Sequence, residues 1–383
     1  MDLKQLELGF GCMRMPLLNP EDSTSFDFQK IEALFDRYLE QGFQYFDTAY
    51  TYHGYHAEEA VKKALVERHP RDMFRLATKM PLRDFKDEED LERVFQEQLD
   101  HCGVDFFDSY LLHNMGQNVY EKCCKYHVFD FVQRKKKEGK IREAGMSFHD
   151  MPELLEEILE TYGDALDFVQ LQINYLDWEQ PNVQSKKCLE IARRYHKPVV
   201  VMEPCKGGML AKVPEEVEKL FRDYDPEAFA ASWAMRFAAS QEGVFRVLSG
   251  MNDESQLEDN MKTFRDFKPL TEEEYKIIWK AAEIINSETA IPCTGCGYCT
   301  HGCPKNIAIP QYFSLYNNMM HMEGRMSSHM TYYYNLTLRH GKSSQCIGCG
   351  QCEKACPQHL PIREYLKDAA EKFETGNAFP VRS

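Results

Sequence analysis

Two short stretches of cysteines near the end of the 383-residue chain constrain its fold more than any other feature. The first reads CTGCGYCTHGCP and the second reads CIGCGQCEKACP, so both follow the spacing C-x2-C-x2-C-x3-C-P. Three thiolates spaced in this way can wrap a short loop around one inorganic cube, and the glycines between them let backbone amides approach the sulfurs. The spacing therefore predicts two 4Fe-4S clusters, with these eight ligands: Cys293, Cys296, Cys299, Cys303, Cys346, Cys349, Cys352 and Cys356.

The fourth cysteine of such a run binds the cluster of the other run in proteins with two clusters. The predicted ligand groups are therefore Cys293, Cys296, Cys299 and Cys356 for one cluster, and Cys346, Cys349, Cys352 and Cys303 for the other. A zinc site is a weaker interpretation, because zinc sites use separated C-x2-C pairs and would leave cysteines over in each run. A disulfide framework is weaker still, since the chain is long and has no apolar signal segment or bilayer-crossing stretch.

The overall composition is typical of an intracellular globular protein. The chain is 43% hydrophobic and carries a formal net charge of -15, which disfavours binding to nucleic acid. The basic run RKKKEGKIR at 134–142 is more simply explained as the solvated end of a helix. We expect a cytoplasmic protein that binds neither nucleic acid nor membrane.

A change of composition near residue 285 predicts two domains, at 1–285 and 286–383. In the first, amphipathic segments such as 28–42, 88–103 and 151–164 alternate with short apolar or β-branched runs. These eight runs lie at 6–14, 43–49, 73–79, 106–113, 141–147, 166–172, 198–204 and 244–250. The alternation predicts an α/β fold of the (β/α)8 TIM-barrel type. A doubly wound sheet is the alternative, although no G-x-G-x-x-G follows the first run.

Polar residues at the carboxyl ends of barrel strands are the catalytic candidates. Asp47 and Tyr52 follow the second predicted strand, Lys79 ends the third and His113 ends the fourth. Lys79, held by Asp47, is expected to lower the pKa of Tyr52 and make it a usable proton donor. His113 can orient a carbonyl oxygen. Proton donation to a carbonyl requires a hydride donor as well, which implies a nicotinamide.

The motifs FDTAYTYHG, ATK, LLHN and GKIREAGMSFH resemble those of the aldo-keto reductase superfamily over residues 5–265. The resemblance implies that Asp47, Tyr52, Lys79 and His113 form the catalytic tetrad of that family, with Tyr52 as general acid. It also implies cofactor contacts at Met13 and Arg14 (ribose), Ser147 and Gln170 (carboxamide), Lys206 and Gly207 (pyrophosphate loop), and at Met202, Gly250, Gln256 and Asn260. With its cysteine-rich part, the whole chain resembles the subgroup fused to a C-terminal ferredoxin-like domain.

Several positions depart from the pattern of the family. Met202 stands where an aromatic side chain commonly stacks on the nicotinamide, and Phe148 replaces an asparagine. Gly250 and Gln256 stand where many members grip the 2'-phosphate of NADPH with cations. NADH should therefore be at least competitive with NADPH unless Lys206, Lys262 or Arg265 substitutes. A flavin in the barrel mouth is a further alternative.

The segment between the two cysteine runs predicts an α-helical ferredoxin-like domain rather than a compact bacterial one. Its sequence indicates helices at 310–326 and 327–338. Each run ends in Cys-Pro, at Cys303 and Cys356, and we expect both pairs to open helices that pack around the clusters.

The function predicted from these features is interconversion of a small carbonyl compound and its alcohol with NADH or NADPH. A 4Fe-4S cluster passes one electron at a time whereas a hydride carries two, so direct exchange between them would need an adapter such as a flavin. The clusters could be structural or dock a partner. Alternatively, the protein is a flavin-linked reductase that exchanges electrons with a ferredoxin-like carrier, or an electron-transfer protein whose barrel has lost turnover.

Overall fold

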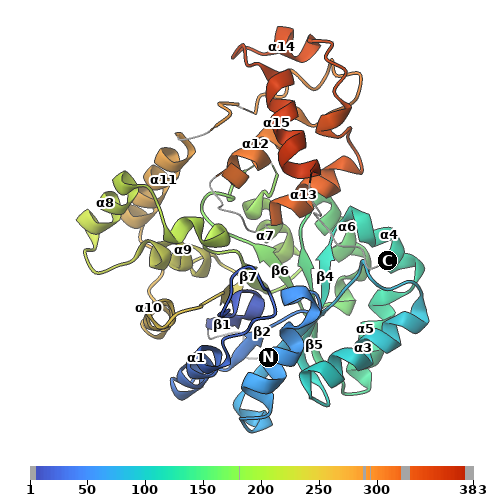
Figure 1. Ribbon diagram of the computed structural model, residues 1–383, viewed down its shortest axis with the longest axis vertical. Helices are drawn as coiled ribbons and strands as arrows, with labels where there is room; N and C mark the ends of the chain where they lie inside the picture. The colour runs from blue at the N-terminus through green and yellow to red at the C-terminus, as the bar shows by residue number, and fades with distance from the viewer. Residues whose placement is uncertain (1–5, 181, 288–289, 294, 321–327, 376–383) are drawn as a thin grey trace.

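The N-terminal part of the chain forms a closed barrel of eight parallel strands, as predicted (Figure 1). The computed structural model describes residues 6–180, 182–287, 290–293, 295–320 and 328–375. Each strand pairs with the next, and β8 pairs with β1 to close the barrel. The strands are β1 (Glu7–Gly11), β2 (Tyr45–Asp47), β3 (Arg75–Met80), β4 (Phe107–Met115), β5 (Ile141–Phe148), β6 (Phe168–Gln172), β7 (Val199–Met202) and β8 (Val244–Ser249).

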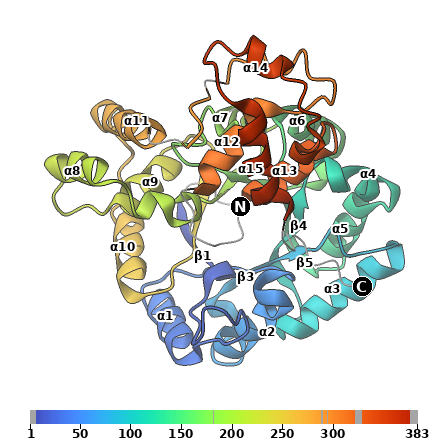
Figure 2. The same cartoon turned by 45° about the horizontal axis from the view of Figure 1, so that its top comes forward.

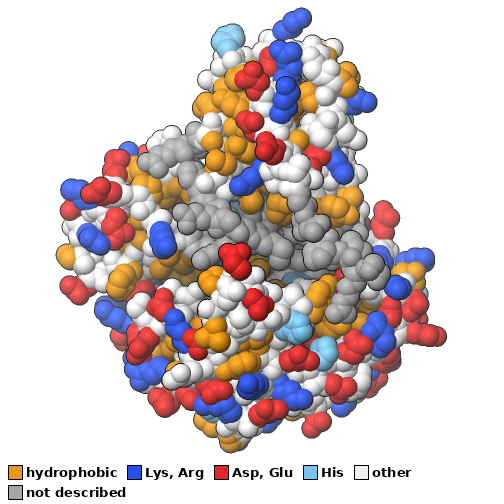
Figure 3. All heavy atoms as spheres, viewed as in Figure 1, with side chains coloured by type: hydrophobic (Ala, Val, Ile, Leu, Met, Phe, Trp, Pro, Cys, Tyr) orange, Lys and Arg blue, Asp and Glu red, His pale blue; other side chains and the backbone are white. Residues whose placement is uncertain are grey.

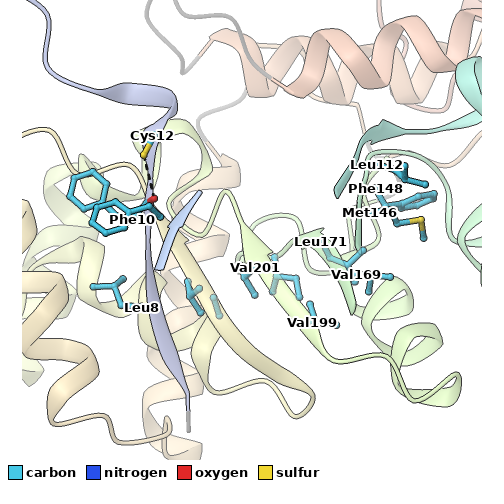
Figure 4. Close-up of a cluster of buried hydrophobic side chains, with 14 of the residues drawn as sticks. Leu8, Phe10, Cys12, Leu112, Met146, Phe148, Val169, Leu171, Val199 and Val201 are labelled. Atoms are coloured by element: carbon cyan, nitrogen blue, oxygen red, sulfur yellow. Dashed lines mark hydrogen bonds between the residues drawn. The ribbon is translucent and has the colours of Figure 1, made fainter. Parts of the chain in front are cut away.

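Helices cover the outside of the barrel and bury its outward-facing apolar side chains. Figure 4 shows part of this core, in which Leu8 and Phe10 lie on β1, Val169 on β6, and Val199 and Val201 on β7. The larger of these helices are α1 (Phe28–Glu40), α3 (Glu88–Cys102), α4 (Gln117–Lys125), α5 (Val128–Lys137), α6 (Pro152–Tyr162), α7 (Ser185–Arg194), α8 (Glu215–Tyr224), α9 (Ala230–Ala239), α10 (Glu254–Arg265) and α11 (Glu272–Ser287). The short α2 (Ala57–Val61) lies between β2 and β3.

The inside of the barrel is filled by a separate apolar cluster. Tyr45, Ala77, Leu111, Phe168 and Val200 belong to it, each from a different strand. A Cβ atom on Gly145 would lie 2.5 Å from the ring of Phe168, so this ring can fill the interior only because its neighbour on β5 is glycine. The interior is thus a packed core, and ligands must bind at the end of the barrel.

The cysteine-rich part forms a helical domain with its own core, made by α12 (Ile309–Met320), α13 (Ser328–Thr337), α14 (Gln351–Ala355) and α15 (Ile362–Glu374). This domain stands on one end of the barrel, beside α6 and α7 (Figures 1 and 2). The helices predicted at 310–326 and 327–338 correspond to α12 and α13, and residues 321–327 lie outside the described residues. The expectation that the two Cys-Pro pairs open helices is wrong, because α12 and α15 begin several residues later, at Ile309 and Ile362.

Acidic and basic side chains are interspersed over the visible face of the barrel (Figure 3). Within the described ranges, no helix is both long and apolar enough to span a bilayer. Helix α11 runs to Ser287, just past the predicted domain boundary.

Candidate active site and cluster-binding cysteines

The alternation of side chains along each strand brings the predicted polar residues to one end of the barrel. Successive residues of a strand face opposite sides, so a residue two positions after an interior one also faces inward. Asp47 follows the interior Tyr45 in this way, and Lys79 follows Ala77. On each of the next four strands, a residue two positions after an interior one faces inward in the same way: His113, Ser147, Gln170 and Met202. These side chains form a ring at the carboxyl ends of the strands.

Hydrogen bonds from the ammonium group of Lys79 join this residue to two other predicted catalytic residues, Asp47 and Tyr52. Lys79 Nζ donates to Asp47 Oδ1 at 2.5 Å and to the hydroxyl of Tyr52 at 3.2 Å. A third bond of 2.8 Å reaches the carbonyl oxygen of Thr48. The ring of His113 lies edge-on to that of Tyr52, with 5.7 Å between ring centroids. Lys79, Asp47 and His113 are buried, at 1%, 3% and 8% exposure, whereas Tyr52 is half-buried at the edge of the constellation.

The pKa directions at this site follow from burial and from the Lys79–Asp47 pair. Burial would lower the pKa of Lys79, but the carboxylate of Asp47 outweighs it and raises that pKa above its usual value. Burial also raises the pKa of Asp47, against the charge of Lys79; because the lysine holds its proton more tightly, we treat the pair as ionised. Burial, helped by the charge of Lys79, lowers the pKa of His113 well below its usual range. The imidazole is therefore neutral near pH 7.

Tyr52 behaves differently from the prediction. Burial raises the pKa of its phenol, and the charge of Lys79 opposes this rise without overcoming it. The cost of placing a phenolate away from water thus exceeds the attraction of an ammonium 3.2 Å away. Tyr52 keeps its proton at neutral pH.

A buried polar network lies behind Lys79, and no pattern in the sequence predicted it. Gln98 of α3 donates from Nε2 to the carbonyl oxygen of Lys79 at 3.1 Å and to Glu58 Oε1 at 2.8 Å. The hydroxyl of Thr78 donates to the same carboxylate oxygen at 2.5 Å. Both Glu58 and Gln98 are at most 1% exposed. The network fixes the backbone that carries Lys79, yet its members are scattered among ordinary helical and strand patterns.

Ser147 and Gln170, predicted to hold a nicotinamide carboxamide, lie directly opposite each other on β5 and β6. Ser147 Oγ accepts a 2.9 Å bond from the backbone N–H of Asn114. Gln170 is 1% exposed, and its Oε1 has no hydrogen-bond partner within the described part of the chain. A buried acceptor of this kind suits a ligand that donates N–H groups, as a carboxamide does.

The predicted ribose and pyrophosphate positions meet where the segment after β1 contacts the loop after β7. Arg14 donates from Nη1 to the carbonyl oxygen of Gly207 at 2.8 Å, and its Nη2 lies 3.8 Å from the carboxylate of Glu203. Met13 is 38% exposed, and Met202 ends β7 half-buried. The loop after β7 turns through Gly207 at a φ of 69°, a conformation that favours glycine.

Lys206 is engaged by a partner that the sequence did not reveal. Its ammonium pairs with the carboxylate of Asp177, which follows β6, and the two side chains are 1% and 0% exposed. Asp177 also accepts bonds from Gln172 at 2.7 Å and from Asn174 at 2.6 Å. Lys206 is therefore committed to an internal ion pair and cannot serve a phosphate at the rim.

The positions predicted near a 2'-phosphate surround the start of α10. Gln256 is exposed, and its Nε2 donates to the carboxylate of Asp253 at 2.6 Å. Asn260 is buried and donates to the hydroxyl of Ser249 at 2.9 Å. Gly250 is exposed, and residues 250–256 contain no lysine or arginine. Of the predicted substitutes, Lys262 is exposed, and Arg265 donates to the side chain of Gln41 at 2.5 Å.

The eight cysteines of the C-terminal domain line two cavities in the predicted crosswise grouping. One cavity is lined by Cys303, Cys346, Cys349 and Cys352, and the other by Cys293, Cys296, Cys299 and Cys356. Ile309 lies in the wall of both. In each run the two glycines between the first and third cysteines have left-handed φ angles between 71° and 77°: Gly295, Gly297, Gly348 and Gly350. The two loops thus share one backbone shape.

The two cavities suit 4Fe-4S cubes better than single metal ions. In the described residues, no three His, Cys, Asp or Glu side chains converge as ligands of one ion would. The four cysteines of a cube each bind a different iron and need not converge on one point, whereas zinc requires about 2.3 Å from every sulfur to one centre. None of the fourteen cysteines, all of which lie in the described ranges, forms a disulfide.

A closed parallel barrel with a buried Lys–Asp–Tyr cluster at its carboxyl end, followed by a helical domain with two four-cysteine cavities, defines a two-domain oxidoreductase. The sequence profile of the Aldo/keto reductase family matches residues 7–283, and that of the 4Fe-4S dicluster domain matches residues 292–360. The chain belongs to the aldo/keto reductase family and carries a C-terminal 4Fe-4S dicluster domain.

Similar proteins were found for each part of the chain. "Uncharacterized oxidoreductase YqkF" of Bacillus subtilis is 23% identical over 309 residues, covering 72% of this chain and 92% of its own. A component of the ion-translocating oxidoreductase complex of Buchnera aphidicola is 32% identical over 74 residues. That match covers 19% of this chain and only 13% of the relative's length.

Two solved structures share the barrel fold. Aldo-keto reductase AKR11C1 from Bacillus halodurans in its holo form has a TM-score of 0.59 at 24% identity, covering 73% of this chain and 95% of that one. An aldo-keto reductase from Klebsiella pneumoniae in complex with NADPH has a TM-score of 0.56 at 19% identity, covering 71% and 89%.

Proposed function

We propose that the barrel interconverts a carbonyl compound and its alcohol with NADH or NADPH, and that Tyr52 is the general acid. The observation that carries this proposal is the buried ammonium of Lys79, which bonds both Asp47 and the hydroxyl of Tyr52. A tyrosine in contact with a permanently charged lysine can release a proton and leave a stabilised phenolate. The neutral His113 lies edge-on to the Tyr52 ring, with 5.7 Å between the ring centroids.

In the reductive direction, His113 donates a hydrogen bond to the carbonyl oxygen and fixes its position beside Tyr52. A reduced nicotinamide, when bound, supplies hydride to the carbonyl carbon. Tyr52 transfers its proton to the oxygen as negative charge develops there, so the phenolic O–H bond breaks and the alcohol O–H bond forms. The raised pKa of Tyr52 keeps the donor protonated before each turnover, and a proton from solvent restores it afterwards.

Ser147 and Gln170 would hold the carboxamide of the nicotinamide, with Met13, Arg14 and Gly207 at the ribose and pyrophosphate. The buried, unpaired Oε1 of Gln170 supports this assignment. The NADPH in the Klebsiella pneumoniae aldo-keto reductase supports a nicotinamide in a barrel of this fold. Met202, Gly250, Gln256 and Asn260 would form the rest of the cofactor cleft.

We further propose that NADH is at least competitive with NADPH. Residues 250–256 offer a 2'-phosphate no cation, and their acidic members Asp253 and Glu254 would repel it. Lys206 is occupied by Asp177, which leaves the exposed Lys262 as the nearest uncommitted cation on α10. A ribose with a free 2'-hydroxyl needs no counter-charge.

The eight cysteines would ligate two 4Fe-4S clusters in the two groups that line the cavities. Apolar walls, including Ile309, Phe313 and Leu366, would exclude water from the clusters. In this proposal the clusters stabilise the domain or receive a partner, while the barrel works independently.

A second candidate function is electron exchange between the barrel, the clusters and a ferredoxin-like carrier, with a flavin as adapter. It is favoured by the direct docking of the two domains. Asn182 donates to the carbonyl oxygen of Gln311 in α12 at 3.1 Å, and Ser314 donates to Gln180 at 2.8 Å. The clusters therefore sit on the enzyme itself rather than on a loose tether.

The two functions differ in what a nucleotide does to the clusters. Protein purified without oxygen would be mixed with NADH or NADPH, and the visible absorbance of the clusters followed before and after addition of a carbonyl panel. We expect nucleotide oxidation only when a carbonyl is present, with the cluster absorbance unchanged. Bleaching of the clusters by nucleotide alone would instead establish the electron-exchange function.

A further inference from the structure

Helix α13 of the cluster domain packs on the barrel next to the proposed active site. Asn335 donates from Nδ2 to the carbonyl oxygen of His149 at 2.9 Å, and both residues are buried. The ring of Tyr332 meets the ring of His149 edge-on, with 5.8 Å between centroids. Figures 1 and 2 show α13 close to the barrel end from which β4 and α6 emerge. His149 is thus held from both domains.

His149 lies in the ring of polar residues that the strands place at the barrel mouth. It follows β5 directly, and its backbone N–H donates to Met115 at the end of β4 at 3.1 Å. By the alternation of the strand it falls on the same side as Ser147, one step nearer the mouth. The charge of Lys79 contributes to lowering the pKa of both His113 and His149, so both rings lie within its field.

One ring nitrogen of His149 lacks a hydrogen-bond partner among the described residues. The side chain is 7% exposed, and its Nδ1 has no hydrogen-bond partner in the part of the chain that the structure describes. A buried ring nitrogen without a partner is rare in native proteins and calls for an explanation. Burial and the charge of Arg83 lower the pKa of His149 to about 3, so the ring is neutral and can donate at one nitrogen and accept at the other.

We propose that His149 is a substrate-binding residue that hydrogen-bonds a second oxygen of the substrate, next to the carbonyl held by Tyr52 and His113. This rests on the proposed carbonyl reduction. Neighbouring strands lie about 4.8 Å apart, so groups at the ends of β4 and β5 can reach oxygens on adjacent carbons of one small molecule. The substrate class is an α-hydroxy or α-oxo carbonyl compound.

The neutral state of the ring suits uncharged oxygens of the substrate. A neutral imidazole can donate a hydrogen bond to a keto oxygen, and it can donate to or accept from a hydroxyl. Tyr332 and Asn335 are positioning residues in this assignment, because they touch His149 rather than the substrate. The cluster domain thereby takes part in substrate selection by the barrel.

The test compares acetoin with 2-butanone, which lacks only the α-hydroxyl. Binding is measured in the full chain with its clusters, in the Tyr52→Phe background, so that the result does not depend on turnover. His149→Phe keeps a ring against Tyr332 but carries no nitrogen, and His149→Gln retains a donor and an acceptor. We expect Tyr52→Phe to bind acetoin roughly tenfold tighter than 2-butanone. His149→Phe should abolish that preference, His149→Gln should restore part of it, and Asn335→Leu should reduce it.

Two results would overturn the assignment. One is equal binding of acetoin and 2-butanone before His149 is changed, which decides the matter even if His149→Phe does not fold. The other is a His149→Phe variant that weakens both ligands alike, which would make His149 a packing residue. Turnover by the unmodified enzyme is measured separately. If it reduces neither ketone nor any other carbonyl, the proposed function fails, while the binding preference still decides the role of His149.

Discussion

The polar groups of the barrel mouth are fixed by bonds to one another, whereas the cysteines of the C-terminal domain surround cavities that the protein itself does not fill. Lys79 makes three hydrogen bonds of 3.2 Å or less. Beside one of these cavities, the sulfur of Cys303 accepts a bond from the backbone N–H of Ile307 at 3.5 Å. Hydrogen bonds within the protein therefore set the barrel site, whereas the C-terminal domain places its cysteines around two cavities.

The hydrophobic cores of the two domains differ in the same sense as their sites. The barrel core draws on every strand and nearly every helix of the first domain, whereas the second core is small and includes the ligand cysteines Cys299, Cys352 and Cys356 among its buried members. Small domains often need a metal or another cross-link for stability. We therefore expect the cluster bonds to contribute folding free energy to the C-terminal domain and none to the barrel.

The largest expected effect separates barrel chemistry from the clusters. Tyr52→Phe removes the phenolic proton and keeps the ring, so kcat/KM for carbonyl reduction should fall by about 10²-fold or more. Iron content and the visible spectrum should not change. Tyr55→Phe, in the same short helix, is the matched control and should retain activity. Undiminished turnover by Tyr52→Phe would remove Tyr52 from the mechanism.

The reverse experiment removes a cluster and leaves the barrel alone. Cys299→Ala should lower the iron content from about eight to about four per chain, because Cys299 lines only one of the cavities. The melting transition of the barrel should not move. Cys188→Ala, a buried cysteine of α7, controls for loss of a thiol and should keep all the iron.

The crosswise grouping can be tested with the same readout. Cys303→Ala and Cys352→Ala should disturb the same cluster in electron paramagnetic resonance, since both residues line one cavity. Cys303→Ala and Cys299→Ala should disturb different clusters. If Cys303→Ala instead reproduces the spectrum of Cys299→Ala, each run binds its own cluster and the grouping is wrong.

Acidic pH should destabilise the contact between the barrel and the C-terminal domain. Burial lowers the pKa of both His149 and His329 to about 3, from a usual value of 6.5. Between these two pKa values the unfolded chain binds more protons than the folded one. The contribution of each buried histidine to the free energy of unfolding is therefore complete above pH 6.5 and decreases as the pH falls. At pH 5 the loss from His149 alone should be about 2 kcal/mol.

The comparison with His149→Gln isolates this contribution, because both proteins carry the same acid-labile clusters. Urea unfolding from pH 7.5 to pH 5 should show a steeper loss of stability in the unmodified protein, by about 2 kcal/mol at the acid end. His196→Gln, at an exposed position of the barrel, should behave like the unmodified protein. Parallel pH profiles for all three would mean that His149 is not held neutral by burial.

The barrel and the cysteine grouping could be predicted from sequence because both depend on local spacing. Every predicted strand corresponds to an observed one, because short apolar or β-branched runs between amphipathic segments can be recognised along the chain. The four-cysteine groups follow from the run spacing in the same way. Asp47 lies two positions after Tyr45, and Lys79 lies two positions after Ala77, so each polar residue faces the same side of its strand as the interior residue before it.

What could not be predicted depends on partners far apart in sequence. The ion pair of Lys206 with Asp177 joins two loops, and it changes Lys206 from a phosphate candidate into a structural residue. The contact of Asn335 with His149 spans 186 residues and two domains. The pKa of Tyr52 was predicted in the wrong direction because burial, which no local pattern reports, outweighs the charge of Lys79.

The smallest expected effect concerns the rim of the barrel, where we propose that exposed side chains, rather than the buried network, influence the choice of nucleotide. Gln256→Lys should raise kcat/KM for NADPH by roughly threefold, the size expected for an exposed ion pair. The value for NADH should change little. The ratio of the two values, measured at low and at physiological salt, is the readout, because an exposed pair is screened by ions.

Thr263→Lys adds the same charge about 10 Å further along α10, at 1.5 Å per residue, and should leave the ratio unchanged. A threefold gain in both variants would mean that the rim responds to total charge and holds no defined phosphate position. A gain confined to Gln256→Lys and lost at high salt would place the 2'-position of the nucleotide at the start of α10. That result would also support the proposed use of NADH, because the acidic residues there would leave a 2'-phosphate without a counter-charge, whereas the free ribose hydroxyl requires none.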